Sequence, residues 1–363
     1  MTPLLLGLLG FLVLRLLHRI YWLYFGYPNR RRGDLNLELE ALFRRFDACE
    51  EVLLLTSEVD GTALKVRRVG RGERKVLLLN GVGTDLFMWL PIFESCLALH
   101  PGLFAEFSFI IPSYRGLFTA DSEREVEVTM ELCLRDVLQL SRHLGIDCYD
   151  TIIGWSTGAQ LAITCCARHP GTARKLFLLN ASVGQTLHTV FQTLVPLPHL
   201  LGRLISGAVI SLIRLVVPLC HTRLWPVFKA TAESPFFRLA LEGLSFFGGF
   251  PDYQPVYFHQ YMFDVFSCPT HTMALLNLIV SLDEKCPAGA RSLLHETVIV
   301  SGLMDCMTGI YHSTRLAEQL RHCKHVMFTM GSHFVLIEWP QMIAKELVIL
   351  LRQSAERQTT PSR

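Results

Sequence analysis

The stretch DTIIGWSTG, residues 150–158, joins a short apolar run to a serine that lies between two glycines. A helical pattern follows it directly and continues to Arg168. A serine at such a junction is typical of a tight turn that presents its hydroxyl above the edge of a sheet, at the N-terminus of a helix. Small neighbours are needed there because the backbone is strained and closely packed. The stretch therefore predicts that Ser156 is a nucleophile, and the alternative is a glycine and serine turn that only packs.

Apolar runs of strand length alternate with helical patterns on both sides of this stretch. Residues 52–59 and 62–69 flank Asp60-Gly61, a two-residue turn signal for an antiparallel hairpin. Buried strands are predicted at residues 75–80, 107–112, 150–153, 175–179, 296–301 and 326–330, and helices at residues 35–46, 84–99, 129–144, 154–168, 313–321 and 341–352. Apolar strands that alternate with helices predict an α/β fold, with a mostly parallel sheet covered by helices on both faces.

This alternation stops at residue 183 and resumes at residue 294. Residues 183–293 are helical in period and rich in Phe, Leu and Pro, which predicts a helical cap inserted between two halves of the core. The two halves are residues 50–182 and 294–352, and residues 353–363 form a polar tail.

The cap contains one long apolar stretch, residues 200–220. It includes Arg203 and Arg214, which would be costly at the centre of a bilayer. We therefore expect an amphipathic lid helix that covers the pocket and touches a membrane, rather than a spanning helix. Five phenylalanines at positions 236–250 could line an acyl-chain tunnel or form plain cap core.

A serine nucleophile needs a base, and the base needs an orienting acid. Asp305 follows the predicted strand at 296–301, and His333 follows the last predicted strand. The carboxyl ends of parallel strands meet at one edge of a sheet, so these positions favour Asp305 as the acid and His333 as the base. The competing acid is Asp283, which falls in the cap, and Cys306 is interpreted as a packing residue.

Acyl transfer also requires donors for the negative charge on the former carbonyl oxygen. The backbone N–H groups of Thr157 and of Val82, in the loop Asn80-Gly81-Val82-Gly83, are the predicted oxyanion hole. An ordinary tight turn after a strand is the alternative for that loop.

Composition limits the partners of the chain. It has 363 residues with 34 Lys+Arg against 32 Asp+Glu, so its net charge of +2 gives no support to nucleic-acid binding. Charged residues make up 18%, below the roughly 25% of an average soluble domain. This excludes disorder as the main state and makes a membrane surface a candidate partner.

The eleven cysteines show no C-x-x-C pair and no zinc-ligand spacing. Most lie in apolar runs, which favours reduced core residues in a cytosol-like compartment over the disulfides of a secreted protein. No metal or organic cofactor is expected.

Residues 1–33 are predicted to be a membrane anchor that spans a bilayer or lies in its interface. Residues 3–14 are unbroken apolar, Arg15 and Arg19 could snorkel, and no cleavage site of a signal peptide is present. Basic residues lie only on the C-terminal side, so the body of the protein is expected on the cytosolic face of the endoplasmic reticulum or a similar membrane. The alternative is an organellar transit peptide, because the first acidic residue is Asp34.

Residues 50–352 resemble the α/β-hydrolases, in the family that includes monoacylglycerol lipases, carboxylesterases and haloperoxidase-like esterases. The resemblance is carried by Asn80-Gly81, by residues 113–116 (SYRG) and 154–158, by Gly302-Leu303-Met304-Asp305, and by GSHFVLIEWP at residues 331–340. Asn80 and Trp155 replace histidines that are usual in the family, and Ala159 replaces a glycine. Ser156 in place of an aspartate argues against the dehalogenase and epoxide-hydrolase branches.

The sequence therefore predicts a membrane-associated serine hydrolase that cleaves a lipophilic carboxylic ester, acylglycerol or lysophospholipid-like, through an acyl-enzyme. The alternatives are an acyltransferase or thioesterase with the same triad, and a non-catalytic protein of this fold that recruits partners to membranes. The glycosylation signal Asn180-Ala181-Ser182 is discounted, because it lies at the end of a strand near the predicted active face.

Overall fold

The computed structural model describes residues 34–46, 48–118, 126–188, 199–218, 225–234, 236–237, 255–266, 268–284 and 293–359, with four isolated positions before residue 34. The predicted anchor, residues 1–33, lies outside the described residues apart from these four positions.

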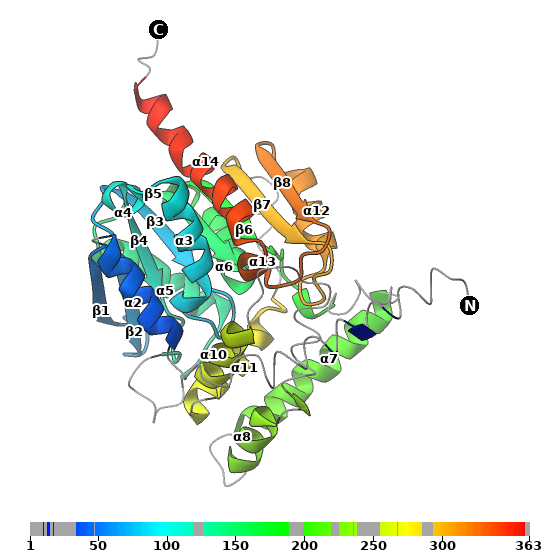
Figure 1. The fold of residues 1–363 in the computed structure, drawn as a ribbon. Helices are drawn as coiled ribbons and strands as arrows, with labels where there is room; N and C mark the ends of the chain where they lie inside the picture. The colour runs from blue at the N-terminus through cyan, green and yellow to red at the C-terminus, as the bar shows by residue number, and fades with distance from the viewer. Residues whose placement is uncertain are drawn as a thin grey trace.

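Eight strands form one sheet in the order β1-β2-β4-β3-β5-β6-β7-β8 (Figure 1). The strands are β1 (Glu50–Thr56), β2 (Ala63–Val69), β3 (Arg74–Leu79), β4 (Phe107–Pro112), β5 (Tyr149–Trp155), β6 (Ala173–Leu179), β7 (Glu296–Gly302) and β8 (Cys323–Phe328). β2 pairs antiparallel with β1 and β4, and all other pairs are parallel. The predicted α/β fold with a mostly parallel sheet is confirmed.

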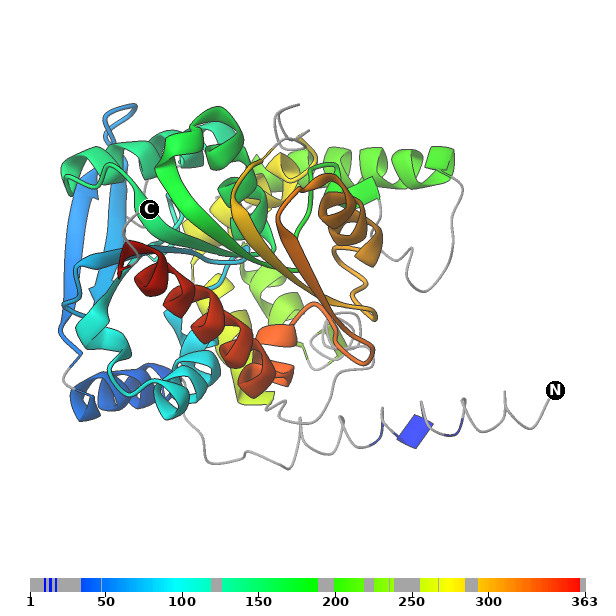
Figure 2. The same cartoon turned by 90° about the horizontal axis from the view of Figure 1, so that it is seen from above.

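Helices cover both faces of the sheet, as Figure 2 shows. The helices of the core are α2 (Asp34–Arg45), α3 (Leu90–Leu99), α4 (Leu103–Glu106), α5 (Met130–His143), α6 (Thr157–Arg168), α12 (Ile310–Gln319), α13 (Val335–Glu338) and α14 (Pro340–Thr359), with short 3-10 turns η2 (Leu86–Trp89) and η3 (Pro170–Thr172). In β3, Val76 and Leu78 face the layer of α2, α3 and α14, whereas Leu77 and Leu79 face the layer of α5 and α6. Burial on both faces explains why the central strands read as unbroken apolar runs.

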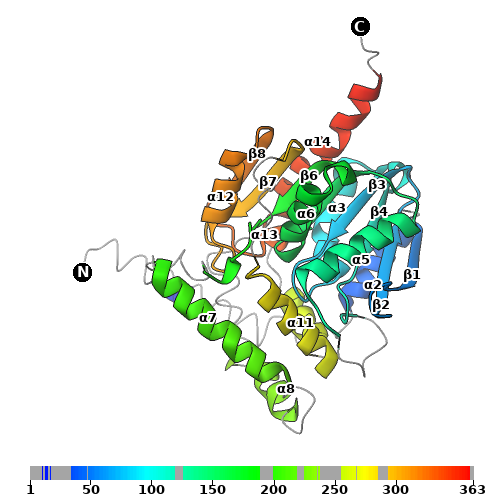
Figure 3. The same ribbon diagram turned by 180° about the vertical axis from the view of Figure 1, so that it is seen from behind.

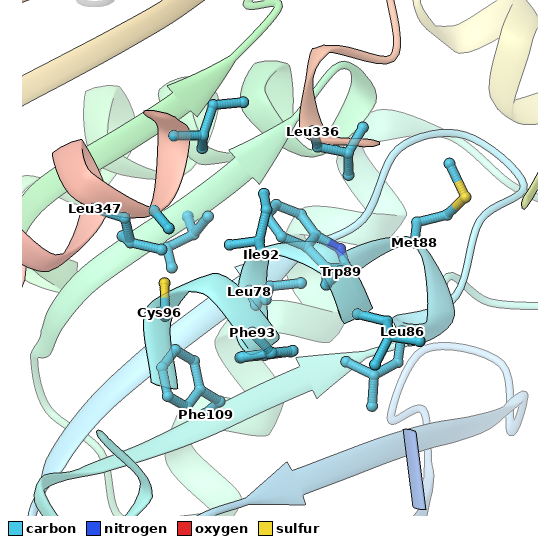
Figure 4. Close-up of a cluster of buried hydrophobic side chains, with 14 of the residues drawn as sticks. Leu78, Leu86, Met88, Trp89, Ile92, Phe93, Cys96, Phe109, Leu336 and Leu347 are labelled. Atoms are coloured by element: carbon cyan, nitrogen blue, oxygen red, sulfur yellow. The ribbon is translucent and has the colours of Figure 1, made fainter. Parts of the chain in front are cut away.

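The layer beside α3 is a dense apolar cluster (Figure 4). Leu78 of β3 and Phe109 of β4 meet Phe93 of α3, and Leu347 comes from α14. The Phe93 ring lies edge-on to the Phe109 ring, with centroids 5.3 Å apart. This packing joins the first half of the core to the last helix.

Two predicted boundaries were wrong at the hairpin. The strands end at Thr56 and restart at Ala63, so a six-residue loop replaces the predicted two-residue turn. The loop is held by the fully buried guanidinium of Arg115, which donates to the Ser57 hydroxyl at 3.0 Å and to the Asp60 carboxylate at 3.1 Å. A long-range ion pair between Asp60 and the buried Arg115 therefore overrides the local turn signal.

Two further boundaries near the C-terminus differ from the prediction. β8 covers Cys323–Phe328, so it starts three residues before and ends two residues before the predicted 326–330, because pairing with β7 begins at the Thr297–Cys323 position. Helix α14 continues to Thr359 instead of ending at residue 352, and only Pro361 lies beyond it as a helix breaker.

The stretch predicted as a cap contributes helices between β6 and β7. They are η4 (Thr186–His188), α7 (His199–Val216), α8 (Trp225–Glu233), α10 (Pro255–Val265) and α11 (Pro269–Ser281), and no strand of the sheet comes from the described residues of this stretch. Among the helices that the structure describes, none has the length and apolar character needed to cross a membrane.

Candidate active site

Ser156 lies between the end of β5 and the start of α6 in a strained conformation. Its φ of +54° and ψ of −112° are rare for a residue with a side chain, and its relative exposure is 4%. The turn is closed by glycines: a Cβ at Gly154 would approach the Gly158 carbonyl oxygen to 2.5 Å, and a Cβ at Gly158 would press on the backbone of Leu79. The G-x-S-x-G pattern therefore forms the strand-to-helix turn that the sequence predicts, with Ser156 at its apex.

Asp305 and His333 lie side by side in the two loops that follow β7 and β8. The His333 Nδ1 atom is 3.0 Å and 3.1 Å from the two carboxylate oxygens of Asp305, and both side chains are buried. The spacing of 28 positions in the chain is thus closed by the parallel pairing of the two strands. Geometry of this kind fixes the tautomer of the ring and leaves Nε2 as the free nitrogen.

The Asp305 carboxylate accepts hydrogen bonds from several groups besides His333. The backbone N–H groups of Met307 and Thr308 donate to one oxygen, each at 2.8 Å. The Thr308 hydroxyl and the Asn180 amide donate to the other, each at 2.6 Å. Burial alone would raise the pKa of Asp305, but attraction to His333 and these hydrogen bonds lower its pKa below the ordinary 3.8. Asp305 is therefore held ionised and in one orientation.

Asn180 is a site residue that the sequence analysis did not find. It directly follows β6, has a positive φ of +48°, and is 1% exposed while its amide contacts Asp305. The sequence singled it out only as a glycosylation signal. Its position at the carboxyl end of a central strand is the signal that would have found it. In the folded protein this amide is buried against a carboxylate.

Asn180→Ala is expected to lower kcat by about 10- to 100-fold with little change in KM, because a hydrogen bond to a charged group contributes roughly 1.5–3 kcal/mol. Steady-state kinetics on a soluble ester would measure this. Ser182→Ala removes the same glycosylation signal without touching Asp305, and its kcat should stay within about threefold of wild type. Equal losses in both variants would contradict a positioning role for Asn180.

The loop that carries His333 is fixed by a buried carboxylate. Glu338, at the end of α13, is fully buried and accepts hydrogen bonds from the Ser332 backbone N–H at 2.7 Å and from the Ser332 hydroxyl at 2.6 Å. Two short bonds to a charged acceptor leave the residue before His333 little freedom. The motif GSHFVLIEWP therefore contains both His333 and the carboxylate, Glu338, that fixes its loop.

Trp155 connects three parts of the site. Its indole Nε1–H donates to the His333 carbonyl oxygen at 3.1 Å, and its ring lies 5.7 Å from the His333 ring between centroids. A Cβ at Gly81 would come within 2.7 Å of the same indole. The indole therefore occupies the space that a side chain at position 81 would need.

The loop predicted to hold the oxyanion lies between Trp155 and the cap helices. The Thr84 hydroxyl donates to the Gly81 carbonyl oxygen at 2.9 Å, and Gly83 has a φ of +67°. A Cβ at Gly83 would come within 2.5 Å of Leu275 in α11. The Asn80 side-chain oxygen accepts from the Trp89 indole at 2.8 Å, whereas its buried amide nitrogen has no hydrogen-bond partner among the described residues.

The roles of Val82 and Thr157 as oxyanion donors stay a prediction. Thr157 is the first residue of α6, so its backbone N–H has no partner within the helix. Val82 is partly buried and follows Gly81, which packs on the indole beside His333. The cap residue Asp283 lies elsewhere: its carboxylate is 3.3 Å from His188.

The described part of the chain offers no group of three or more His, Cys, Asp or Glu residues placed to bind a metal ion. The nine cysteines that the structure describes are free thiols, and Cys306 is buried beside Asp305.

Comparison with known proteins gives the fold its name. No protein-family model matches the chain, and no curated protein sequence matches it. Solved structures do match it. An esterase from Thermogutta terrifontis with malate bound is 17% identical, with 84% of this chain and 98% of that chain covered and a TM-score of 0.58. A loop variant of a haloalkane dehalogenase from Bradyrhizobium elkanii is 16% identical, with 85% of this chain and 100% of that chain covered and a TM-score of 0.61. An alpha/beta hydrolase enzyme from a Medee basin deep-sea metagenome library is 16% identical, with 86% of this chain and 99% of that chain covered and a TM-score of 0.56. These proteins share the architecture at low identity and differ in activity. The chain therefore has the α/β-hydrolase fold.

Proposed function

We propose that the chain is a membrane-associated serine hydrolase that cleaves a lipophilic carboxylic ester, such as an acylglycerol or a lysophospholipid-like lipid. One observation carries the proposal: a strained, glycine-flanked Ser156 lies one residue from the indole that binds the loop of the buried Asp305–His333 pair. A nucleophile, a base and an acid at the carboxyl edge of one sheet meet the requirements of acyl transfer. Structural neighbours that are esterases agree with this class of reaction.

The reaction follows from the roles of these side chains. The Ser156 hydroxyl oxygen attacks the ester carbonyl while His333 Nε2 takes the hydroxyl proton, and the backbone N–H groups of Val82 and Thr157 stabilise the oxyanion. Collapse of the intermediate breaks the ester bond, and the protonated His333 gives its proton to the leaving alcohol. Water then attacks the acyl-enzyme with His333 again as base, and the acid product leaves. Asp305 stays ionised throughout and stabilises the imidazolium.

The lipophilic substrate and the membrane location are the parts of this proposal that rest on the surface of the protein. The sequence before residue 34 is apolar for twelve residues from position 3 to position 14, and exposed leucines lie on α7 beside the core. A soluble polar ester would not require such surfaces.

Labelling by a fluorophosphonate probe tests the proposed function. In detergent, the full-length chain is expected to react with the probe, whereas Ser156→Ala should not react and His333→Ala should react at least about 1,000-fold more slowly. Ser95→Ala is a matched control, because the Ser95 hydroxyl donates to the Pro91 carbonyl oxygen of the same helix, α3. Folding of each variant is checked by circular dichroism. A folded wild type that stays unlabelled, or a Ser156→Ala variant labelled like wild type, would refute the proposal.

A further inference from the structure

Helix α7 exposes a continuous apolar face. Its seven large aliphatic side chains on this face are between 39% and 69% exposed. They are Leu200, Leu201, Leu204, Ile205, Val209, Leu212 and Leu215. Aliphatic side chains scattered singly over a surface are ordinary, whereas seven gathered on one helix are typical of an interaction site. We define these seven residues as the outer face of α7.

The opposite side of α7 packs against other cap elements, so the outer face stays exposed to solvent. Gly202 and Ser206 are buried on the inner side. Just past the helix end, buried Val217 forms a small cluster with Met273 of α11, which Ile213 of the inner side joins. The helix also lies against η4, which begins six residues after Asn180. The cap cannot hide the outer face by rolling α7 without breaking these contacts.

The apolar surface continues past α7. Val227 of α8 is 61% exposed, and Phe236, just after α8, is 82% exposed. Figures 1 and 3 show α8 at one end of α7, on the side of the molecule away from α14. An apolar border that extends over more than one helix suits an extended surface better than a compact binding partner.

Charge indicates which surface the border fits. No Asp or Glu occurs between Asp150 and Glu233 in the sequence, so α7 has no acidic residue. Arg203 and Arg214 are both exposed. Eleven positions separate them, close to three helical turns, so both arginines lie along the same border of the outer face. An apolar face bordered by arginines is the pattern of a helix that lies in the interface of a membrane with anionic lipids.

We propose that the outer face of α7, continued by Val227 and Phe236, docks on an anionic lipid surface, with α7 parallel to the membrane plane. The apolar side chains enter the headgroup boundary, and Arg203 and Arg214 contact lipid phosphates. The proposal deepens the proposed function and rests on it in one respect: a lipid-ester hydrolase must take its substrate from such a surface. Docking through the cap places η4, and with it the loop after β6, next to the lipid phase.

The first test locates the helix in a vesicle-bound protein, so that binding through residues 1–33 does not confuse the result. Full-length Ser156→Ala protein, with the exposed Cys49 and Cys148 replaced by serine, is labelled with an environment-sensitive dye at Leu212→Cys. Lys345→Cys, at an exposed position of α14 outside the cap, is the matched control. Vesicles contain equal parts phosphatidylcholine and phosphatidylglycerol, or phosphatidylcholine alone.

On the mixed vesicles the dye at position 212 is expected to shift to the emission of an apolar environment and to be quenched by nitroxide-labelled lipid, while the dye at position 345 stays in water. Replacing Arg203 and Arg214 by glutamine should reduce the difference between the two lipid compositions at least about threefold. If the protein binds vesicles and the dye at position 212 stays in water, the proposal is wrong. The proposal is also wrong if, in the absence of lipid, the dye at position 212 becomes shielded from water as the protein concentration rises. That result would mean that a second copy of the protein covers the outer face of α7.

A second variant separates this proposal from the proposed function. Leu204→Asn with Leu212→Asn should lower hydrolysis of an ester carried in vesicles by about tenfold or more, because two exposed leucines no longer enter the lipid. Fluorophosphonate labelling of the same variant in detergent reports on Ser156 alone. If the wild-type protein is not labelled, the proposed hydrolase function is refuted, and membrane docking can still be measured with the dye. Intact labelling with unchanged vesicle hydrolysis would refute docking.

Discussion

Asp305→Asn is expected to lower kcat for ester hydrolysis by about 10,000-fold while KM changes little. The carboxylate accepts bonds from Asn180, Met307, Thr308 and His333, and it donates none. An asparagine at this position must turn its NH₂ group either toward the backbone N–H groups of Met307 and Thr308 or toward the Asn180 amide and the Thr308 hydroxyl. His333 Nδ1 lies 3.0 Å and 3.1 Å from the two oxygen positions, so in either orientation the NH₂ group also favours the wrong tautomer of the ring. Both outcomes remove the stabilisation of the imidazolium that forms when Ser156 gives up its proton.

The measurement is steady-state kinetics of purified variants, with a matched carboxylate as control. Asp283 also faces a histidine, His188, at 3.3 Å, and it was the competing acid in the sequence. Asp283→Asn is expected to keep kcat within about threefold of wild type. A large loss of kcat in Asp283→Asn with a small loss in Asp305→Asn would identify Asp283, and not Asp305, as the acid of the triad. Small losses of kcat in both variants would show that neither carboxylate supports His333 in the reaction.

The same carboxylate gives a stability effect whose sign follows from its lowered pKa. Because the folded state binds this proton less readily than the unfolded chain, the ionised Asp305 contributes stability above its ordinary pKa of 3.8. That contribution is lost as the pH falls from 3.8 through the lowered pKa of the folded state. Asp305→Asn lacks this titration, so the gap between its free energy of unfolding and that of wild type should narrow in strongly acidic solution.

The parts of the site that the sequence predicted are those set by local position. Ser156, Asp305 and His333 each come just after a strand, and a parallel sheet brings such positions to one edge whatever the intervening chain does. Asn180 and Glu338 were not assigned, because their roles depend on particular side-chain contacts that no local pattern reveals. Asn180 meets Asp305 from 125 positions away, and Glu338 was read as part of a motif without a role.

The fold shows the same division between local and distant causes. Central strands such as β3 and β5 were predicted within about two residues, because burial on both faces leaves an unbroken apolar run. The hairpin loop was predicted too short, because Arg115 lies more than 50 positions from Asp60 and no local pattern reveals their ion pair. The predicted amphipathic character of residues 200–220 agrees with α7, since helical period is a local property.

Gly158→Ala is expected to destabilise the protein by at least about 3 kcal/mol, the upper end of the usual cost of overpacking. Alanine is the better helix former, by roughly 1 kcal/mol, so a gain would follow if space were available in α6. Space is absent: the new methyl group would meet the carbonyl groups of Leu79 and Asn80, the latter at 2.7 Å. These are backbone atoms of the strand end and of the loop that leads to Val82, and they cannot turn away as a side chain could.

Relief of this clash requires α6 to move away from β3, and that movement separates the two parts of the predicted oxyanion hole. Gly158→Ala should therefore lose activity even at denaturant concentrations where it is folded. The free energy of unfolding is measured by urea denaturation beside Gly171→Ala, whose added methyl group meets nothing within 4 Å and should change stability by no more than about 0.5 kcal/mol. If Gly158→Ala unfolds at the urea concentration of wild type and keeps its activity, the close approach of α6 to β3 is wrong. The strained turn at Ser156 would then need another cause.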